Sequence, residues 1–293
     1  MRRMKHMHRA LAAVLSIVLA AALAAQTAPR EPLTVMSFNV RYGDANDGEN
    51  RWTARREALF DTIRRQDADL VGLQEALDFQ IDEIVGAAPI YAVIGVGRDD
   101  GAAKGEYAAI LFRKDRLRVA EAGTFWFSDT PAVPGSKSWG NNVTRICTWA
   151  RLVDRDGRGF WIFNVHLDHE SQPSRERSTE LLQQRIEARS PREPVIVTGD
   201  FNVGEDNPAM RILTGSSSPP LVDTFRVLHP GETQAGTFNG FTHGNLGGEK
   251  IDYVLVQPGT EVIRAEIVRT SRNDRYPSDH FPVVARVRLV DRD

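Results

Sequence analysis

Cysteine is almost missing from this chain of 293 residues, because Cys147 is the only one. A single cysteine excludes an internal disulfide and a metal site made of several thiolates. Basic runs are missing as well, outside the first few residues. The chain has 37 Lys and Arg against 39 Asp and Glu, and loss of residues 1–24 with their four basic groups would leave a net charge of −6. This acidic balance counts against a long nucleic-acid footprint, although a local basic groove would still fit within it.

Long hydrophobic runs are also scarce. The longest uncharged apolar run, residues 10–25, is short for a membrane span and contains a possible cleavage site at Ala22-Leu23-Ala24. Four basic residues precede it, namely Arg2, Arg3, Lys5 and Arg9. The pattern is typical of a secretory signal peptide, which we assign to residues 1–25, and it predicts a secreted or periplasmic protein. An uncleaved N-terminal anchor is the alternative interpretation.

Short apolar runs rich in β-branched residues are what the rest of the chain has in abundance. Strands are predicted over several such runs, including residues 33–40, 70–75, 107–113 and 195–198. Helical spacing of apolar residues is confined to a few segments, of which residues 174–189 are the longest. Residues 30–293 show no repeat and no linker, so one domain is expected. Many strands and few helices predict two packed sheets flanked by helices.

One strand end stands out. The buried run Val195-Ile196-Val197 leads into Gly199, and Asp200 and Asn202 follow two positions apart. Side chains two positions apart in extended chain lie on one side, so both can serve one site. A plain turn is the alternative, because Gly, Asp and Asn are common turn residues.

Other predicted strands carry polar groups of the same kinds near their ends. The full set is Asn39, Glu75, His166, Asp200, Asn202, Asp252, Asp279 and His280. Carboxylate and amide oxygens are ligands for a hard cation such as Mg²⁺, and histidines beside carboxylates can transfer protons. Together these groups supply what metal-assisted hydrolysis of a phosphate ester requires.

Six short motifs occur in a fixed order along the chain. They are Ser-Phe-Asn-Val, Leu-Gln-Glu, Asn-Val-His-Leu-Asp-His, Gly-Asp-Phe-Asn, Ile-Asp-Tyr and Ser-Asp-His. In this order they resemble the endonuclease/exonuclease/phosphatase superfamily, from about residue 33 to 290. The resemblance implies a catalytic domain over residues 30–293 with a four-layer α/β sandwich fold. In that fold two mixed, mainly antiparallel β-sheets pack face to face between helices, and the active site lies at one edge of the sheets.

The resemblance also implies a divalent metal, Mg²⁺ with Mn²⁺ possible. Glu75 matches the carboxylate that holds the metal in the superfamily. Asn39 matches its neighbour beside the metal, and Asp279 lies next to the metal directly or through water.

Catalytic roles are implied for five further residues. His166 matches the donor to the scissile phosphate, and Asn202 matches the residue that stabilises the phosphate. Asp200 matches the residue that orients or deprotonates the attacking water, and Asp252 matches the partner of His280. Whether Asp200 or His280 is the base stays open at this point.

Substrate-binding residues are harder to assign. Arg145 begins a predicted strand near Asn142 and can clamp a phosphate, or it can simply form an ion pair at the strand end. His169 extends the site or forms a surface hydrogen bond. The aromatic residues Phe238 and Phe241 stack on a sugar or base, or they anchor their glycine-rich loop.

The function expected from these observations is that of a secreted phosphohydrolase, either a phosphodiesterase or a phosphatase, that depends on a divalent metal. The partner would be a small phosphate ester; the alternative is an extracellular or periplasmic nuclease acting on a short nucleic acid. The chain departs from the inositol-phosphatase signature, which has Cys-Asp-Arg where this chain has Lys250-Ile251-Asp252. Neither a membrane span in the mature protein nor an obligate protein partner is expected.

The export prediction can be checked directly. Cleavage after the apolar run should leave a mature chain that begins near residues 25–29, because the small-residue cleavage site lies there. Mass spectrometry of the protein recovered from the native cell envelope or medium measures this. Recovery of the chain with Met1 intact would favour the anchor instead.

Overall fold

The computed structural model describes residues 29–216, 220–246 and 248–291. The predicted signal peptide, residues 1–25, lies outside this described part. None of the helices within it is both long and apolar enough to cross a membrane.

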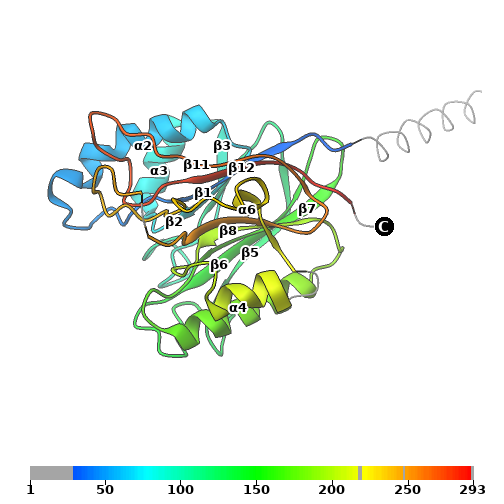
Figure 1. Ribbon diagram of the computed structural model, residues 1–293. Coiled ribbons are helices and arrows are strands. Elements are labelled where there is room, and N and C mark those ends of the chain that lie inside the picture. Colours follow the sequence, from blue (N-terminus) through cyan, green and yellow to red (C-terminus); the bar gives the residue numbers. More distant parts are fainter. Residues whose placement is uncertain (1–28, 217–219, 247, 292–293) are drawn as a thin grey trace, which may run out of the picture.

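In the described part of the chain, twelve strands form two six-stranded sheets (Figure 1). The first sheet has the strand order β11 (Glu261–Ile267), β12 (Val283–Arg288), β1 (Leu33–Asn39), β2 (Leu70–Gln74), β4 (Ile110–Arg113) and β3 (Tyr91–Ile94). The second has the order β5 (Arg118–Trp126), β6 (Ile146–Val153), β7 (Gly159–His166), β8 (Val195–Asp200), β10 (Asp252–Val256) and β9 (Val222–Asp223). Only the pairs β1–β2 and β7–β8 are parallel, so both sheets are mixed and mainly antiparallel, as predicted.

Helices cover the outer faces of the two sheets. On the first sheet lie α2 (Trp52–Gln66) and α3 (Asp78–Ala87), whose residues Leu59 and Ile81 belong to one apolar cluster with Phe38 of β1. On the second sheet lies α4 (Gln172–Glu187), and Leu182 packs there beside Val197 of β8. Figure 1 shows α2 and α3 on the opposite side of the sheets from α4. With the apolar core between the sheets, this makes the four layers that the sequence predicted.

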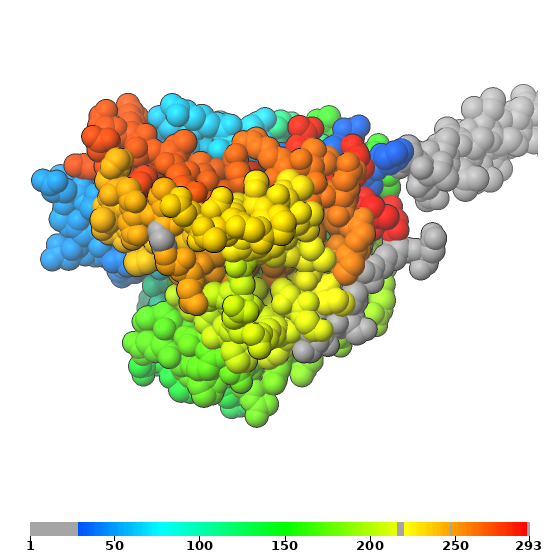
Figure 2. Space-filling view, in the orientation of Figure 1, coloured from blue at the N-terminus to red at the C-terminus, as the bar shows by residue number. Residues whose placement is uncertain are grey.

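The shorter elements lie in the connections between strands. They are η1 (Gly48–Asn50), α5 (Pro208–Arg211), η2 (Ile212–Ser216) and α6 (Thr224–Leu228). In the space-filling view, the segment from α6 to β11, yellow to orange, forms much of the face turned to the viewer (Figure 2).

The inward-facing residues of the central strands change from apolar to polar toward one edge. On β8, Ile196 belongs to the core between the sheets, and Thr198 and Asp200 follow it on the same face. On β7 the order is the same, with Ile162 in the core and Asn164 after it. The period of two in each strand therefore produces an apolar core and, at one edge of the sandwich, a buried polar region.

One predicted strand is shorter than expected. The run over residues 107–113 forms β4 only from Ile110, whereas Tyr107 makes an isolated bridge with Ala76. The residues before this bridge form a loop instead of a strand. This loop brings Glu106 to the polar edge of the sheets, where it contacts His166.

Candidate active site

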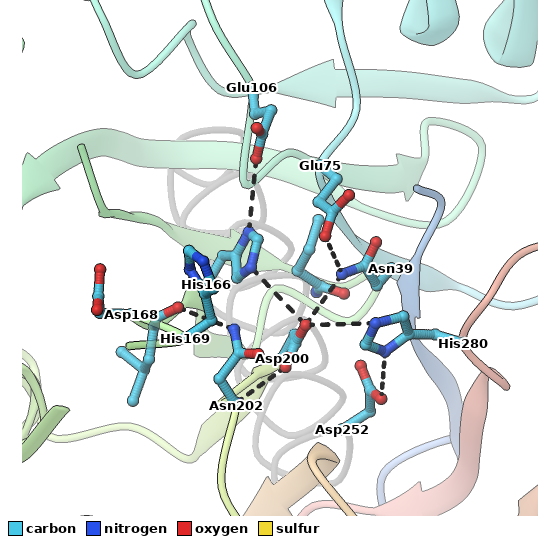
Figure 3. A network of polar contacts seen from close by, with 12 residues as sticks. Asn39, Glu75, Glu106, His166, Asp168, His169, Asp200, Asn202, Asp252 and His280 are labelled. Carbon is cyan, nitrogen blue, oxygen red and sulfur yellow. Dashed lines mark hydrogen bonds and ion pairs between the residues drawn. The ribbon is translucent and has the colours of Figure 1, made fainter. Parts of the chain in front are cut away.

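Strand register gathers the predicted catalytic residues around Asp200. The parallel pair β7–β8 places His166 beside Asp200, and the antiparallel pair β8–β10 places Asp252 on its other side. From the facing sheet, Asn39 ends β1 and Glu75 follows β2 directly. Figure 3 shows Asn39, His166 and His280 around the Asp200 carboxylate, with Glu75 joined to Asn39 and Asp252 joined to His280.

Asp200 is almost completely buried and is held by hydrogen bonds from both sheets. Its Oδ2 accepts a bond of 2.9 Å from Asn39 Nδ2, and its Oδ1 accepts one of 2.9 Å from the backbone N–H of Asn202. The Nε2 atoms of His166 and His280 lie 3.7 and 3.8 Å from Oδ2. Burial, with the nearby charge of Asp252, raises the pKa of Asp200 to about 7, against the opposing effects of His280 and the hydrogen bonds.

Asp252 fixes the ring of His280. The two residues are buried, and His280 Nδ1 donates to Asp252 Oδ2 over 2.9 Å, so Nε2 faces the site. Burial alone would lower the pKa of His280, but the carboxylates of Asp252 and Asp200 outweigh it and hold this pKa well above its usual range. His280 is therefore an imidazolium at neutral pH.

His166 lies in the opposite electrostatic environment. Burial, together with the charges of Arg145 and Arg98, holds its pKa well below the usual value. Its ring is neutral at neutral pH. The same residue type thus occurs in two protonation states on the two sides of Asp200.

A group of carboxylates occupies the wall formed by the first sheet. Glu75 accepts hydrogen bonds from Asn39 Nδ2 at 2.9 Å and from the Tyr42 backbone N–H at 2.8 Å. Burial would raise the pKa of Glu75, but His280 and these hydrogen bonds hold it below its usual value. For Asp279, burial and the charge of Glu75 together leave the pKa raised, against the opposing effect of His280.

This carboxylate group fits a hard divalent cation. Carboxylate oxygens of Glu75 and Asp200 lie within 4.8 Å of each other, and unlike the protonated ring of His280 they have free lone pairs for a cation. Asp279 is buried nearby, with its Oδ2 3.6 Å from Arg41 Nε. The charge of Glu75 contributes to the raised pKa of Asp279, and a cation coordinated by their oxygens would relieve that repulsion.

Asn39 lies between Glu75, the carboxylate predicted to hold the metal, and Asp200. Its Nδ2 donates to Glu75 and Asp200, whereas its Oδ1 accepts a bond of 2.9 Å from the backbone N–H of Arg41. In this arrangement Asn39 orients the two carboxylates and its amide oxygen faces the backbone.

Two site residues hold left-handed backbone conformations. Glu75 has a φ of 63° and Asn202 a φ of 54°. For a residue such as Glu this costs about 1 kcal/mol or more, and such strain is typical of functional sites. The side chain of Asn202 donates to the Leu167 carbonyl over 3.0 Å and faces the site beside Asp200 (Figure 3).

The predicted catalytic groups Asp200, His166 and His280 open onto a cavity of about 680 Å³. Of the residues proposed for substrate binding, Arg145 and His169 line this cavity. Asn142 does not: it is exposed, and its amide contacts Glu170. The residues that line the cavity are Arg41, Tyr42, Asp47, Glu75, Arg98, Glu106, Val143, Arg145, His166, His169, Asp200, Asn202, Phe238, Gly240, Phe241, Ile251, Asp279 and His280.

Arg145 differs from the other deeply buried arginine of this region. Arg55 donates to four backbone carbonyls, those of Asn50, Val40, Pro277 and Arg41, and has an evident structural role. Within the described part of the chain, the Arg145 guanidinium has one hydrogen-bond contact, between Nη2 and His169 Nδ1 at 2.7 Å, and its Nε and Nη1 have no hydrogen-bond partner.

The nearest carboxylate only partly compensates Arg145. Asp168 Oδ2 lies 3.6 Å from Nε, which is too long for a hydrogen bond. Buried guanidinium groups are normally satisfied by acceptors, so Arg145 gives this wall of the cavity an affinity for anions.

Two residues of the site, Glu106 and Arg98, lie outside the predicted set. Glu106 Oε2 lies 3.8 Å from His166 Nδ1, and Arg98 binds both oxygens of Glu106 at 2.6 and 2.8 Å. Both come from the irregular loop before β4, where no strand end marks them. The Gly105-Glu106 pair is a local signal for a turn in the sequence, and Gly105 has a φ of 82° in the structure.

Fold and site together define a two-sheet α/β sandwich with a buried Asp between two histidines and a facing carboxylate wall. The sequence profile of the Endonuclease/Exonuclease/phosphatase family matches residues 36–280. The chain belongs to this family.

Solved structures of bacterial family members are similar over nearly the whole chain. One from Bacteroides thetaiotaomicron, described as an endonuclease/exonuclease/phosphatase family protein, is 34% identical, with a TM-score of 0.82 over 90% of this chain and 99% of that chain. The mannosyl-6-phosphatase of the same species is 34% identical, with a TM-score of 0.79 over 87% of this chain and 99% of that chain. An uncharacterised protein of Acanthamoeba polyphaga mimivirus is 27% identical over 186 residues, 60% of this chain and 68% of that protein.

The neutral state of His166 has a measurable consequence for stability. Its pKa is lowered in the folded protein, so below pH 6.5 the unfolded chain binds a proton that the folded chain does not. The folded protein therefore becomes less stable as the pH decreases. His166→Gln removes this effect. As the pH falls from 6.5 to 5, the parent should therefore lose up to about 2 kcal/mol of unfolding free energy that His166→Gln does not lose.

Urea denaturation of the metal-free proteins at several pH values measures the shift. The control is His243→Gln, whose ring is 55% exposed and does not line the cavity. A difference between His166→Gln and the parent that stays constant with pH would contradict the neutral assignment.

Proposed function

We propose that this protein is a divalent-metal-dependent phosphohydrolase that cleaves a small phosphate ester and is exported from the cytoplasm. The observation that carries the proposal is the buried Asp200 carboxylate, which lies between two histidines and faces a carboxylate wall across one cavity. The similarity to a mannosyl-6-phosphatase supports a small substrate, with sugar phosphates as the first class to test. Export rests on the pattern of residues 1–25.

The metal is assigned to the carboxylate wall. Glu75 is the main proposed ligand, with Asp279 beside it and Asn39 holding the Glu75 carboxylate in place. Mg²⁺ or Mn²⁺ at this wall would polarise a phosphoryl oxygen and neutralise charge that develops in the transition state.

Asp200 is proposed to take the proton of the attacking water. A base works best when its pKa is near the working pH, and the pKa of Asp200 is raised to about 7. His280 already carries a proton at neutral pH, so it serves as the donor. The water oxygen bonds to phosphorus, the bond from phosphorus to the ester oxygen breaks, and that oxygen leaves as an alcohol with the proton of His280.

The remaining polar groups hold the phosphate. His166 is neutral and presents Nε2 toward the same space as Asp200, where it can donate to a phosphoryl oxygen. Asn202 and Arg145 line the cavity beside it. Glu106 lies on the other side of the ring, with Oε2 3.8 Å from His166 Nδ1.

Hydrolysis of small esters tests the proposed function. The purified chain should hydrolyse mannose 6-phosphate or p-nitrophenyl phosphate with Mg²⁺ or Mn²⁺ and lose this activity in EDTA, because the carboxylate wall needs its cation. Plasmid DNA should be a poorer substrate, with a shallow salt dependence of binding, because a duplex contact of 6–10 phosphates needs many basic groups. Steady-state kinetics and nicking assays at physiological salt measure both.

Glu75→Gln is the matched variant for this experiment. It keeps the side-chain size but removes the charge proposed to hold the metal, so both activity and metal binding by calorimetry should be lost. If kcat/KM for plasmid nicking exceeds that for every small ester, the protein is a nuclease.

The role of Asp200 predicts a loss in turnover. Asp200→Asn should lower kcat by roughly 10²–10⁴-fold, the usual size of general acid–base assistance. The control is Asp206→Asn, a fully exposed carboxylate that does not line the cavity. Unchanged kcat in a folded Asp200→Asn variant would show that another group takes the proton.

A further inference from the structure

An exposed phenylalanine lies inside the catalytic cavity. Phe238 is 48% exposed and lines the cavity next to His280, and the two ring centroids are 5.1 Å apart at an interplanar angle of 71°. The edge-to-face contact covers part of the phenyl ring and leaves the rest open. Burial of such a ring is favourable, so its exposure needs a reason.

The residues on either side of Phe238 show that this exposure is not a loose loop end. Thr237 and Asn239 are both fully buried, although they are polar. Thr237 Oγ1 accepts from the backbone N–H groups of Ile251 and Asp252, at 2.9 and 3.1 Å. The polar residues are therefore turned inward and the apolar one outward, the reverse of an ordinary surface strand.

Hydrogen bonds also join residues 237–239 to the segment that carries Asp279 and His280. The N–H of Phe281 donates to the Thr237 carbonyl over 2.7 Å, and the N–H of Asn239 donates to the Asp279 carbonyl over 2.7 Å. Asn239 Nδ2 adds a bond of 3.2 Å to the Ser278 carbonyl. An isolated bridge pairs Phe238 with His280. The phenyl ring is thus held in place beside the imidazolium.

The two walls of the cavity differ in chemistry. The wall around His166 carries Arg145 and His169, which suit the phosphate. His280, beside Phe238, lies across Asp200 from His166 and His169 (Figure 3). A substrate that fits both walls combines a phosphate with a carbon skeleton that has an apolar face.

We propose that Phe238 is a specificity-determining platform that binds the ring face of a sugar phosphate on its alcohol side. The proposal rests on the proposed function, because it assigns the position of the group released by hydrolysis. The C–H groups on one face of a pyranose pack on a phenyl ring, and one open ring suffices for this contact. The other aromatic side chain of this loop in the cavity is Phe241, which is half-buried. The Arg55 guanidinium lies over its ring, 5.7 Å from the ring centroid, so this ring is already in contact with a cation.

Two substrates that differ only in the ring test the platform. Phe238→Ala should raise KM for mannose 6-phosphate about tenfold, the scale of one lost stacking contact, and leave KM for glycerol 3-phosphate within about twofold. Inhibition by inorganic phosphate, which has no alcohol part, should be unchanged. Phe238→Tyr should restore the parent KM because it keeps the ring.

The matched control is Phe79→Ala, which removes a phenylalanine that is 39% exposed and does not line the cavity. Its KM values should equal those of the parent. Adenosine 5′-monophosphate is the third substrate, because a nucleobase also stacks on a phenyl ring.

Each outcome decides a separate question. If the parent hydrolyses none of these esters with Mg²⁺ or Mn²⁺, the proposed function fails. If it hydrolyses them and Phe238→Ala lowers kcat equally for all, the ring only shields His280 and the platform is refuted. A larger loss for the nucleotide than for the sugar phosphate would refute the sugar assignment and place a base on the ring.

Discussion

The hydrogen bond from Asn39 to Asp200 joins the two sheets at the edge where the catalytic groups meet. It runs from β1 of one sheet to β8 of the other, and the same amide nitrogen donates to Glu75. Each sheet has its own ladder, so the distance between the Glu75 and Asp200 carboxylates depends on how the two sheets pack. Asn39 sets this distance because one rigid amide contacts both carboxylates.

A buried polar layer directly below the catalytic residues supports this bond. Asn164 lies two residues before His166, and Thr198 lies two residues before Asp200 on the same inward face. Asn164 Oδ1 accepts from Thr198 at 3.0 Å and from Gln74 at 2.7 Å, and its Nδ2 donates to backbone carbonyls of the facing sheet.

The two sheets approach each other closely at this polar layer. A Cβ on Gly72 would lie 2.3 Å from the Thr198 hydroxyl and 2.5 Å from the Asn164 amide oxygen, so only glycine fits between the two polar side chains. Buried polar groups are costly unless satisfied, and here they hold the catalytic strands in a fixed register across the sandwich.

Charge around Asp200 is divided between the two walls. Carboxylates surround His280 and keep it protonated, whereas burial and two arginines keep His166 neutral. The protonated His280 can thus donate a proton on one side of Asp200, and the neutral His166 can donate a hydrogen bond on the other. The asymmetry comes from tertiary neighbours, because neither histidine has an unusual local sequence apart from its adjoining carboxylates.

Periodicity and motif order in the sequence determined the two-sheet fold, the family and the residues at the strand ends. The period of two decides which face of the sheet each strand side chain lies on. The positions of Asp200, His166 and Asp252 could therefore be predicted from the local pattern of their strands. Loop residues have no such period. Glu106 enters the site through the bridge between Tyr107 and Ala76, whereas Asn142 lies outside the cavity despite its nearness to Arg145 in the chain. The exposure of Phe238 likewise depends on two buried polar neighbours that bind distant backbone, and only the packed tertiary structure decides such contacts.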